Sequence, residues 1–558
     1  MSKQLFVDPV ELRQKGEITF PVIPVNRYQK SVSDELTEGN FTPEELKKIY
    51  RDMFIIREFE TMLNLVKTTG GYNGVEYNNP GPAHLSMGQE AAAVGMAYAL
   101  DTDDFIFGSH RSHGEILAKG LRSIEILPEA ELLSIMEQFW GGATLEVAKK
   151  GFKGGTTKDL GICFLLYGAM AEIFARVTGF NKGLGGSMHT FFTPFGIYPN
   201  NAIVGGSGSI AVGAALYKKV NRKRGIVVAN LGDGALGRGP VMEGMTFASM
   251  DQFTQLWEGD MKGGLPVMFS IMNNQYAMGG QTRGETEGYN FAARIAAGFN
   301  VDAMHAERVD GYNPLAVIDG FRRKKALLEQ KKGPVLLDIV TYRYSGHSPS
   351  DASTYRTPEE VKAWEEIDCI KCFGSKLVEA GVPIVNQIFP KDKAMEIIQP
   401  EYVCVAWDSG KPTFRHQKYD AYKGTRKELD EDLIVQMPII REYLDSANVF
   451  RYEQEGIEAD DIIGSISRKY SEHETVILSS DRDLLQLIDA STSVLLMKKG
   501  ITEMHLVDEK ECLESFGVHP LQIIELKGLM GDPSDNIPGV KGVGEKTAYD
   551  LIYKYAFP

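Results

Sequence analysis

The apolar residues of this chain follow a helical period near its start and strand-like runs further on. They recur at helical spacing from about residue 41 to residue 60, and Thr42 with Pro43 predicts the N-cap and first turn of that helix. Residues 1–45 are mostly polar and irregular. We therefore expect an extended N-terminal arm that leads into a long helix.

Short apolar runs separated by helical stretches occupy the rest of the chain. The first set lies at 226–231, 267–271 and 335–340, and a second set lies at 402–407, 476–479 and 494–497. Strands that alternate with helices predict an α/β fold with a parallel sheet. The composition changes after Val382, and 558 residues are too many for one core. We predict two α/β domains, at 46–382 and 401–558, joined by a junction at 383–400.

Composition and charge restrict the classes of function. With 43% hydrophobic and 24% charged residues the chain resembles soluble globular proteins. Its net charge of −15 does not attract nucleic acid, so any DNA contact needs a local basic patch. We expect no membrane span and no signal peptide, because long apolar runs are missing. Five scattered cysteines, with a lone CxxC at Cys369 and Cys372 that we attribute to chance, favour a reducing cytoplasm.

Polar residues that follow two strands of the first domain predict a metal-held phosphate. Gly232-Asp233-Gly234 follows one apolar run, and Asn274 and Tyr276 follow the next. Parallel α/β sheets bind ligands at these strand ends, where glycines let a phosphate approach the backbone. Asp233, Asn274 and the Tyr276 carbonyl are hard oxygen ligands of the kind that Mg²⁺ prefers beside phosphates. A lone GDG turn is weak evidence, but the pair of motifs one β-α step apart is much stronger.

Further motifs stand in a fixed order between about residues 45 and 370. With the two above, the blocks are His84-Leu-Ser-Met-Gly-Gln-Glu90, Arg111-Ser-His-Gly114, Gly185-Gly-Ser-Met-His189, Gly232-Asp-Gly234, Asn273-Asn274-Gln-Tyr276 and Tyr342-Arg-Tyr-Ser-Gly-His-Ser-Pro-Ser-Asp351. They resemble the alpha subunit of thiamine-diphosphate-dependent 2-oxo acid dehydrogenases. The resemblance implies that Asp233, Asn274 and Tyr276 hold the magnesium of thiamine diphosphate and that Arg111 meets its diphosphate. It also implies that His113 and His347 lie near the thiazolium and the substrate carboxylate, with His347 stabilising charge or shuttling protons.

The same resemblance implies partners, and the chain departs from the family in three places. A beta-type subunit would complete the cofactor pocket, a lipoyl acyltransferase would take the acyl group, and we expect a homo- or hetero-oligomer. His110 stands where the family usually has Tyr, and Ser345 replaces a common His. Residues 251–266 resemble an insertion. These departures leave the expected ligands in place but bear on substrate choice.

Acidic residues dominate the chemistry of the second domain. They stand at strand ends and helix starts, at Asp408, Glu458, Asp460, Asp461, Asp481, Asp483, Asp532 and Asp535. Eight carboxylates gathered together would repel one another unless cations neutralise them. Two Mg²⁺ or Mn²⁺ ions about 4 Å apart, as in phosphodiester hydrolysis, would meet that need. For any single pair, a solvated capping Asp is the alternative.

Basic and glycine-rich segments supply the expected DNA contacts. Basic and aromatic residues alternate between 411 and 427, as a clamp on a nucleic-acid backbone requires, although a solvated helix face has a similar composition. Gly542 and Gly544 belong to a Gly-rich turn before a final helix, and the spacing is typical of a helix-hairpin-helix element at about 537–556.

Residues 385–558 together resemble part of the 5′-3′ exonuclease domain of bacterial DNA polymerase I. The resemblance implies metal ligation by the eight carboxylates and DNA contacts from Arg415, Tyr419, Lys423 and Arg426. The family begins with a strand that ends in another metal-binding Asp, and this sequence shows no such start before residue 401. We therefore expect a truncated nuclease domain with impaired folding and turnover.

Three interpretations remain open from the sequence. The chain is a 2-oxo acid dehydrogenase alpha-like protein fused to a partial nuclease, which is the interpretation that we rank first. Alternatively, it is a structure-specific 5′ nuclease that carries a passenger dehydrogenase fragment, or an inactive fusion of two gene fragments. The sequence does not identify the 2-oxo acid.

Overall fold

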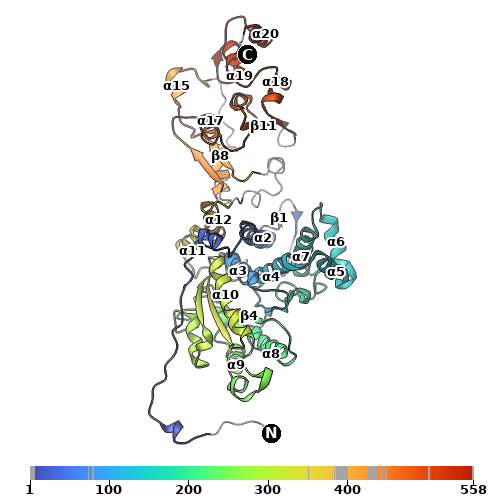
Figure 1. The fold of residues 1–558 in the computed structure, drawn as a ribbon, viewed down its shortest axis with the longest axis vertical. Coiled ribbons are helices and arrows are strands. Elements are labelled where there is room, and N and C mark those ends of the chain that lie inside the picture. Colours follow the sequence, from blue (N-terminus) through green and yellow to red (C-terminus); the bar gives the residue numbers. More distant parts are fainter. Residues whose placement is uncertain are drawn as a thin grey trace. The chain divides into compact units, whose positions relative to one another are not determined.

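The computed structural model resolves two compact units, Met1–Lys376 and Leu377–Pro558. The structure describes residues 7–72, 75–77, 81–349, 351–382, 384, 400–424, 437–438, 440–441, 444–445, 449–499 and 503–555. Most of the expected junction at 383–400 lies outside the described residues. Figure 1 labels the elements of both units.

A five-stranded parallel sheet forms the centre of the first unit, in the order β3-β4-β5-β7-β6. Its strands are β3 (Phe105–Phe107), β4 (Val227–Gly232), β5 (Val267–Asn273), β6 (Glu307–Asp310) and β7 (Val335–Val340). The three strands predicted from apolar runs are therefore confirmed. The sequence missed β3 and β6, because they are only three and four residues long and three of the four residues of β6 are charged.

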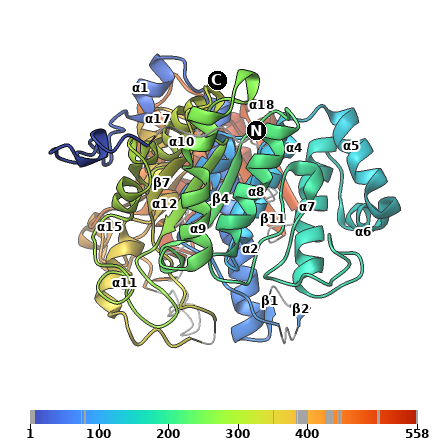
Figure 2. The same cartoon turned by 90° about the horizontal axis from the view of Figure 1, so that it is seen from below.

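Helices surround this sheet, as the turned view in Figure 2 shows for α8, α9 and α10. The helices are α1 (Val32–Thr37), α2 (Pro43–Thr68), α3 (Glu90–Tyr98), α4 (His113–Ile126), α5 (Glu129–Gln138), α6 (Ala143–Gly151), α7 (Thr157–Ile173), α8 (Gly206–Val220), α9 (Gly239–Ala248), α10 (Pro314–Glu329), α11 (Pro358–Glu366) and α12 (Cys369–Glu379). Thr42 forms a capping box with Glu45, so the helix predicted after it is α2.

Alternate residues of the central strands carry the main core. Val227, Ala229 and Leu231 of β4 and Phe269 of β5 pack with buried residues of α8 and α9 in one cluster. In a strand, every second side chain points to the same face, so this pattern places a helical layer over that face of the sheet.

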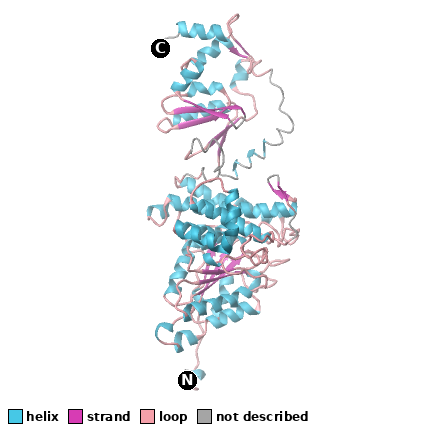
Figure 3. Cartoon of the chain, turned by 90° about the vertical axis from the view of Figure 1, so that its right-hand side faces the viewer, coloured by secondary structure: helices cyan, strands magenta, loops and turns pink. Residues whose placement is uncertain are grey.

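The second unit combines small sheets with helices, as the strands and helices coloured in Figure 3 show. Its strands are β8 (Cys404–Trp407), β9 (Phe450–Glu453), β10 (Thr475–Ser479), β11 (Thr492–Lys499), β12 (Glu503–Val507), β13 (Gly531–Asp532) and β14 (Ile537–Pro538). Its helices include α15 (Phe414–Lys418), α17 (Ala459–Lys469), α18 (Glu509–Phe516), α19 (Gln522–Met530) and α20 (Glu545–Tyr555). β8 and β9 pair in parallel, as do β10 and β11, so the predicted α/β character is confirmed.

Removing a core side chain of the central sheet tests this architecture. Phe269 is fully buried in β5, so Phe269→Ala should lower the free energy of unfolding by about 3–5 kcal/mol. Phe247→Ala is the matched control, because Phe247 is 38% exposed and should cost far less. Urea denaturation followed by circular dichroism measures both, and equal effects would contradict the assigned core.

Candidate functional sites

The parallel pairing of β4 with β5 brings Asp233 and Asn274 together. Gly232 pairs with Met272 in the register, so the residues just after each strand meet at the carboxyl edge of the sheet. The backbone N–H of Asn274 donates a hydrogen bond to the Asp233 carboxylate. Thr282 also donates from its hydroxyl to Asp233 Oδ2, at 2.6 Å.

Asn274 and Tyr276 are fixed by a tight turn. The N–H of Tyr276 donates to Asn274 Oδ1 at 3.2 Å, and Asn274 Nδ2 donates to Gln89 Oε1 at 3.1 Å. Gln275 between them has a φ of 69°, a left-handed conformation that is costly for a residue other than glycine. The Tyr276 hydroxyl donates to Glu360 Oε1 at 2.6 Å. Both predicted ligand residues are buried.

The electrostatics of this edge disfavour uncompensated negative charge. Burial raises the pKa of Asp233 to about 6, despite the hydrogen bonds that it accepts. Burial raises the pKa of Glu287 to about 8, with Asp233 and Asp338 adding to the effect. A cation near Asp233 would relieve this penalty, because it would favour the charged carboxylate.

The two glycines beside Asp233 differ in their surroundings. A Cβ added to Gly234 would lie 3.1 Å from Cβ of Ala277, so Gly234 permits a close approach of two turns. A Cβ on Gly232 would meet nothing within 4 Å. Gly232 therefore faces open space at the strand end, where a ligand has room.

Arg111 and His347 contact each other through side chain and backbone. Arg111 Nη1 donates to the Leu85 carbonyl at 2.7 Å, and Nη2 donates to the His347 carbonyl at 2.8 Å. Burial, together with the positive charge of Arg343, lowers the pKa of Arg111 to about 9. A buried guanidinium held in this way is suited to an anionic group.

His113 lies in a buried hydrogen-bond chain that the sequence did not reveal. Its Nδ1 is 3.0 Å from Glu60 Oε1, and its Nε2 is 2.9 Å from Ser187 Oγ. Glu60 also accepts from the N–H of Ser86 at 2.5 Å. A charged Glu on the buried face of the helix at 41–60 was the available signal for Glu60.

Three imidazoles gather beside Arg111, and of these the sequence motifs predict a role only for His347. Nitrogen atoms of His84, His110 and His347 all lie within 4.8 Å of one another. Burial is the main cause that lowers their pKa values, and the positive charge of Arg111 is the second. The pKa is about 3 for His84 and His110 and about 4 for His347. The rings are therefore neutral at neutral pH.

In the second unit, four of the predicted carboxylates form a mutually repelling group. Burial, together with the charges of Asp481, Asp408 and Glu458, raises the pKa of Asp460 to about 6. Asp408 also accepts from the N–H of Ala459 at 2.7 Å, which ties the end of β8 to the start of α17. Asp481, Asp408 and Glu458 therefore lie close enough to Asp460 for their charges to act on it.

The other four carboxylates, like Glu458 of the first four, are already paired with protein groups. Lys527 Nζ lies 2.7 Å from Asp483 Oδ1 and 3.0 Å from Asp532 Oδ2. Asp535 accepts from the Tyr422 hydroxyl at 2.9 Å, while Asp461 is paired with an arginine. In the described part of the chain, the three-histidine group is the one set of three or more acidic, His or Cys ligands within 4.8 Å. Among the described residues, the carboxylates predicted to bind two metal ions thus lie near one another, but no three of them are close enough to bind one ion together.

Two predicted DNA contacts point into the carboxylate group instead of into solvent. Arg415 donates two hydrogen bonds to Asp461, at 2.7 and 2.8 Å, and lowers the pKa of that carboxyl. Lys423 Nζ lies 2.9 Å from Glu458 Oε2. Tyr419 is 41% exposed and accessible, and Arg426 lies outside the described residues.

The predicted hairpin lies between α19 and α20. β13 and β14 pair in antiparallel fashion, and the N–H of Val543 donates to the Val540 carbonyl at 3.0 Å. Gly542 has a φ of 86°, which favours glycine, and the Gly544 carbonyl accepts from Ala548 at the start of α20. The turn is therefore built as the sequence predicted.

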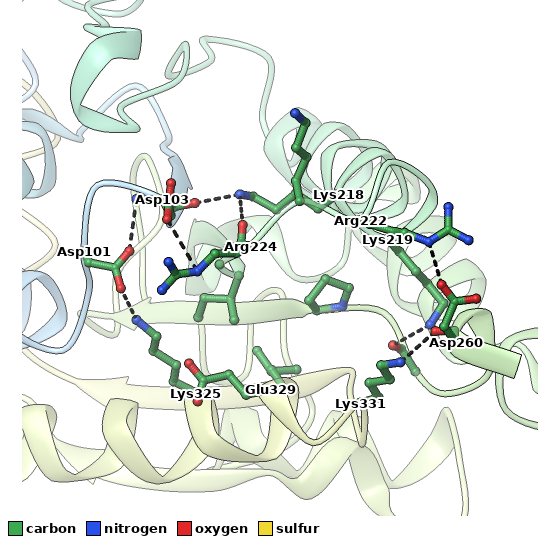
Figure 4. Close-up of a pocket in the computed structure, with 16 residues that line it drawn as sticks. Asp101, Asp103, Lys218, Lys219, Arg222, Arg224, Asp260, Lys325, Glu329 and Lys331 are labelled. Atoms are coloured by element: carbon green, nitrogen blue, oxygen red, sulfur yellow. Dashed lines mark hydrogen bonds and ion pairs between the residues drawn. The ribbon is translucent and has the colours of Figure 1, made fainter.

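A separate pocket of about 410 Å³ lies at the opposite edge of the first unit's sheet, near the start of β4 (Figure 4). Lys218 donates there to the carbonyls of Asp103 and Arg224. Asp260, from the predicted insertion at 251–266, accepts from Arg222 at 2.6 Å. Because Lys218 and Arg222 already have partners within the protein, we assign this pocket a structural role. It lies away from Asp233.

Helices in the described ranges are all too short or too polar to cross a lipid bilayer. Cys369 and Cys372 are free thiols, and so are the other three cysteines.

Comparison with protein families divides the chain in two. The family model of the dehydrogenase E1 component matches residues 72–156 and 142–393. The N-terminal resolvase-like domain of 5′-3′ exonuclease matches residues 383–517, and the C-terminal SAM fold of that exonuclease matches residues 518–556.

Individual relatives show the same division. The pyruvate dehydrogenase E1 component subunit alpha of Rhizobium meliloti is 30% identical over 363 residues, covering 65% of this chain and 85% of that protein. DNA polymerase I of Bacillus subtilis is 46% identical over 165 residues, covering 29% of this chain and 19% of the polymerase, so the chain spans about a fifth of that relative. A structure of T5 5′-exonuclease with bound zinc ions has 25% identity and a TM-score of 0.26, and the match covers 31% of this chain and 68% of that one.

The raised pKa of Asp233 predicts a stability change that depends on pH. The pKa of about 6 in the folded state exceeds the ordinary aspartate pKa of 3.8, so ionisation costs the metal-free fold up to about 3 kcal/mol above pH 6. Asp233→Asn should therefore gain stability over the wild-type chain as the pH rises from 4 to 8. Urea midpoints measured in EDTA across that range test this.

Asp351→Asn is a control of opposite sign. Burial alone would raise the pKa of Asp351, but hydrogen bonds from Tyr355, Ser353 and His347 outweigh it and lower the pKa to about 2. That stabilisation is present above pH 3.8 and is lost as the pH falls toward 2, so this variant should be destabilised at pH 7. Parallel curves for the two variants would contradict the assigned environments.

Proposed function

Because the chain belongs to the dehydrogenase E1 component family, we propose that its first unit is the alpha-type half of a 2-oxo acid dehydrogenase. The resemblances found in the sequence, to this family and to 5′-3′ exonuclease domains, are confirmed by the family models. The substrate class is a pyruvate-type or branched-chain 2-oxo acid, and the acyl group passes to a lipoyl carrier. The observation that carries the proposal is the buried Asp233 carboxylate beside Asn274 at the carboxyl edge of the sheet.

The residues at this edge fit a magnesium ion and a diphosphate. Asp233 has a raised pKa that a cation would lower, and Gly232 faces open space. Asp233, Asn274 and the Tyr276 carbonyl are assigned to Mg²⁺, and Arg111 is assigned to the diphosphate of thiamine diphosphate. When bound, the cofactor would supply a nucleophilic carbon and an electron sink for decarboxylation of the 2-oxo acid.

The chain's own residues orient groups and move protons around that cofactor. Glu60 accepts from His113 Nδ1 and fixes the ring, so that Nε2 is held toward Ser187. His347 is neutral at pH 7 because its pKa is about 4, so it can accept a proton or donate a hydrogen bond to the substrate. His113 and His347 are the proposed catalytic residues.

Partners and location belong to the same proposal. E1 alpha subunits normally pair with beta subunits, so we assign the missing part of the cofactor pocket to such a subunit, in a hetero-oligomer that also meets a lipoyl acyltransferase. Five free thiols suit the reducing cytoplasm.

The second unit is proposed to bind DNA and to act as a 5′-3′ exonuclease-like hydrolase with Mg²⁺ or Mn²⁺. Asp408, Glu458, Asp460 and Asp481 fit a cation, because burial and the charges of the other three raise the pKa of Asp460, and a cation would lower it. When bound, the metal would generate a hydroxide nucleophile and stabilise the leaving oxygen. Tyr419 and the Gly542–Gly544 turn are proposed DNA contacts, and so are Arg415, Lys423 and Arg426.

Cofactor binding gives the first test. Thiamine diphosphate with Mg²⁺ at 100 times its Kd should stabilise the whole chain by about 2.7 kcal/mol and raise its Tm. Asp233→Asn should abolish the shift. Asp260→Asn, which removes an exposed carboxylate at the other edge of the same sheet, should retain it. A wild-type chain that stays unshifted even with a beta-type subunit present would refute the proposal.

Flap cleavage gives the second test. A labelled 5′-flap DNA should be bound and cut in the presence of Mg²⁺ or Mn²⁺, and Asp481→Asn should lower the rate by about 100-fold or more. Asp508→Asn is the matched control, since Asp508 is an N-cap that Asn can replace. If the wild-type chain neither binds nor cuts the flap with either metal, the nuclease assignment fails.

A further inference from the structure

We propose that His84, His110 and His347 form a binding site for one Zn²⁺ ion. The site is distinct from the oxygen ligands assigned to Mg²⁺, because it is made entirely of imidazole nitrogens. Neutral imidazole suits zinc and its neighbours in the periodic table, whereas Mg²⁺ prefers oxygen.

The three ligands come from separate parts of the chain that the fold brings together. His84 precedes α3, His110 follows β3, and His347 follows β7. The ring centroid of His84 lies 4.7 Å from that of His110 and 5.1 Å from that of His347. The ring centroids of His110 and His347 are 5.5 Å apart. One ligand nitrogen from each ring lies within 4.8 Å of the other two.

Two of the ring nitrogens are buried and unsatisfied. His84 Nδ1 and His110 Nε2 have no hydrogen-bond partner among the groups that the structure describes. Buried polar atoms in native proteins are normally paired, and an ion is one explanation for an unpaired one. Tetrahedral zinc with bonds of about 2.0–2.1 Å would hold the three nitrogens closer to one another than the 4.8 Å within which they lie here, so binding requires the rings to move together.

His347 has a ligand atom available as well. Arg111 Nη2 contacts His347 Nδ1 at 3.3 Å but makes a shorter bond, 2.8 Å, to the His347 carbonyl. The longer contact is the one that an ion would replace. Arg111 would then remain held by the carbonyls of His347 and Leu85.

Neighbouring charges limit the affinity without excluding the ion. Arg111 and Arg343 are the positive groups that act on the three rings and disfavour a cation. The negative charge of Asp351 opposes these positive groups, since its carboxylate accepts a hydrogen bond from the backbone N–H of His347 at 2.6 Å. Glu60 is a second negative group, next to Arg111.

A bound ion would occupy the imidazole of His347, which the proposed reaction uses. The site would therefore inhibit decarboxylation and would not assist it. That consequence rests on the proposed function, whereas the binding itself does not.

Cobalt substitution tests the site on the whole chain without any cofactor. Co²⁺ held by three imidazoles and a water in a tetrahedral site should give an intense visible absorption that one equivalent of Zn²⁺ abolishes. Octahedral Co²⁺ on carboxylates absorbs only weakly, so the second unit does not produce this signal.

Variants locate the signal. His110→Tyr keeps an aromatic ring but removes a ligand, and it should weaken binding by about 100-fold or more. His519→Ala, at an exposed histidine of the second unit, and Asp481→Asn, in the carboxylate group, should leave the absorption unchanged. An unchanged signal in His110→Tyr, or a lost signal in either control, would overturn the proposal.

Zinc-edge X-ray absorption of the wild-type chain provides a measurement that depends on no variant. One equivalent of Zn²⁺ should show imidazole scattering with nitrogens at about 2.0–2.1 Å. A shell of oxygen ligands alone would overturn the proposal, whether or not thiamine diphosphate binds. Loss of the cofactor response with an intact imidazole shell would instead refute the proposed function and leave the zinc site standing.

Discussion

The parallel register of β4 and β5 is the constraint on which the first site depends. It sets Gly232 opposite Met272, so the residues that follow each strand meet at one edge. A shift of one residue would turn the core side chains of β4 to the wrong face, and burial of Val227, Ala229 and Leu231 prevents it. The position of Asp233 next to Asn274 is thus fixed by apolar packing several residues away.

The two units handle gathered negative charge in different ways. At the edge of the first sheet, Asp233 and Glu287 are buried and their pKa values are raised. Both carboxyl groups are therefore mostly neutral below pH 6, so negative charge does not accumulate there. In the second unit, Lys527, Lys423 and Arg415 contribute positive charge directly to the carboxylates. A cation would therefore stabilise the ionised forms of the carboxyl groups in the first site. In the second site, half of the carboxylates already pair with a lysine or an arginine.

Local patterns predicted the parts of both sites that lie next to strands and turns. Asp233 and Asn274 follow strands of six and seven residues, and Gly542 stands in a turn that favours glycine, so short-range sequence was enough. The sequence did not predict the contact of Glu60 with His113 or that of Lys527 with Asp483, because these contacts join residues that are 53 and 44 positions apart. The basic segment at 411–427 was interpreted from its charge as a DNA clamp, but spacing cannot reveal that Arg415 and Lys423 turn toward carboxylates instead of toward solvent.

The lysine between Asp483 and Asp532 changes what entry of a metal ion would mean at that end of the second unit. A divalent ion that takes both carboxylates must first displace an ammonium group that stays tethered to α19. Replacing the ammonium group with a divalent ion adds one positive charge between the two acids, whereas an unoccupied acidic pair would gain two. Attraction to the ion is correspondingly smaller, and the displaced lysine stays close enough to compete with the ion for both carboxylates.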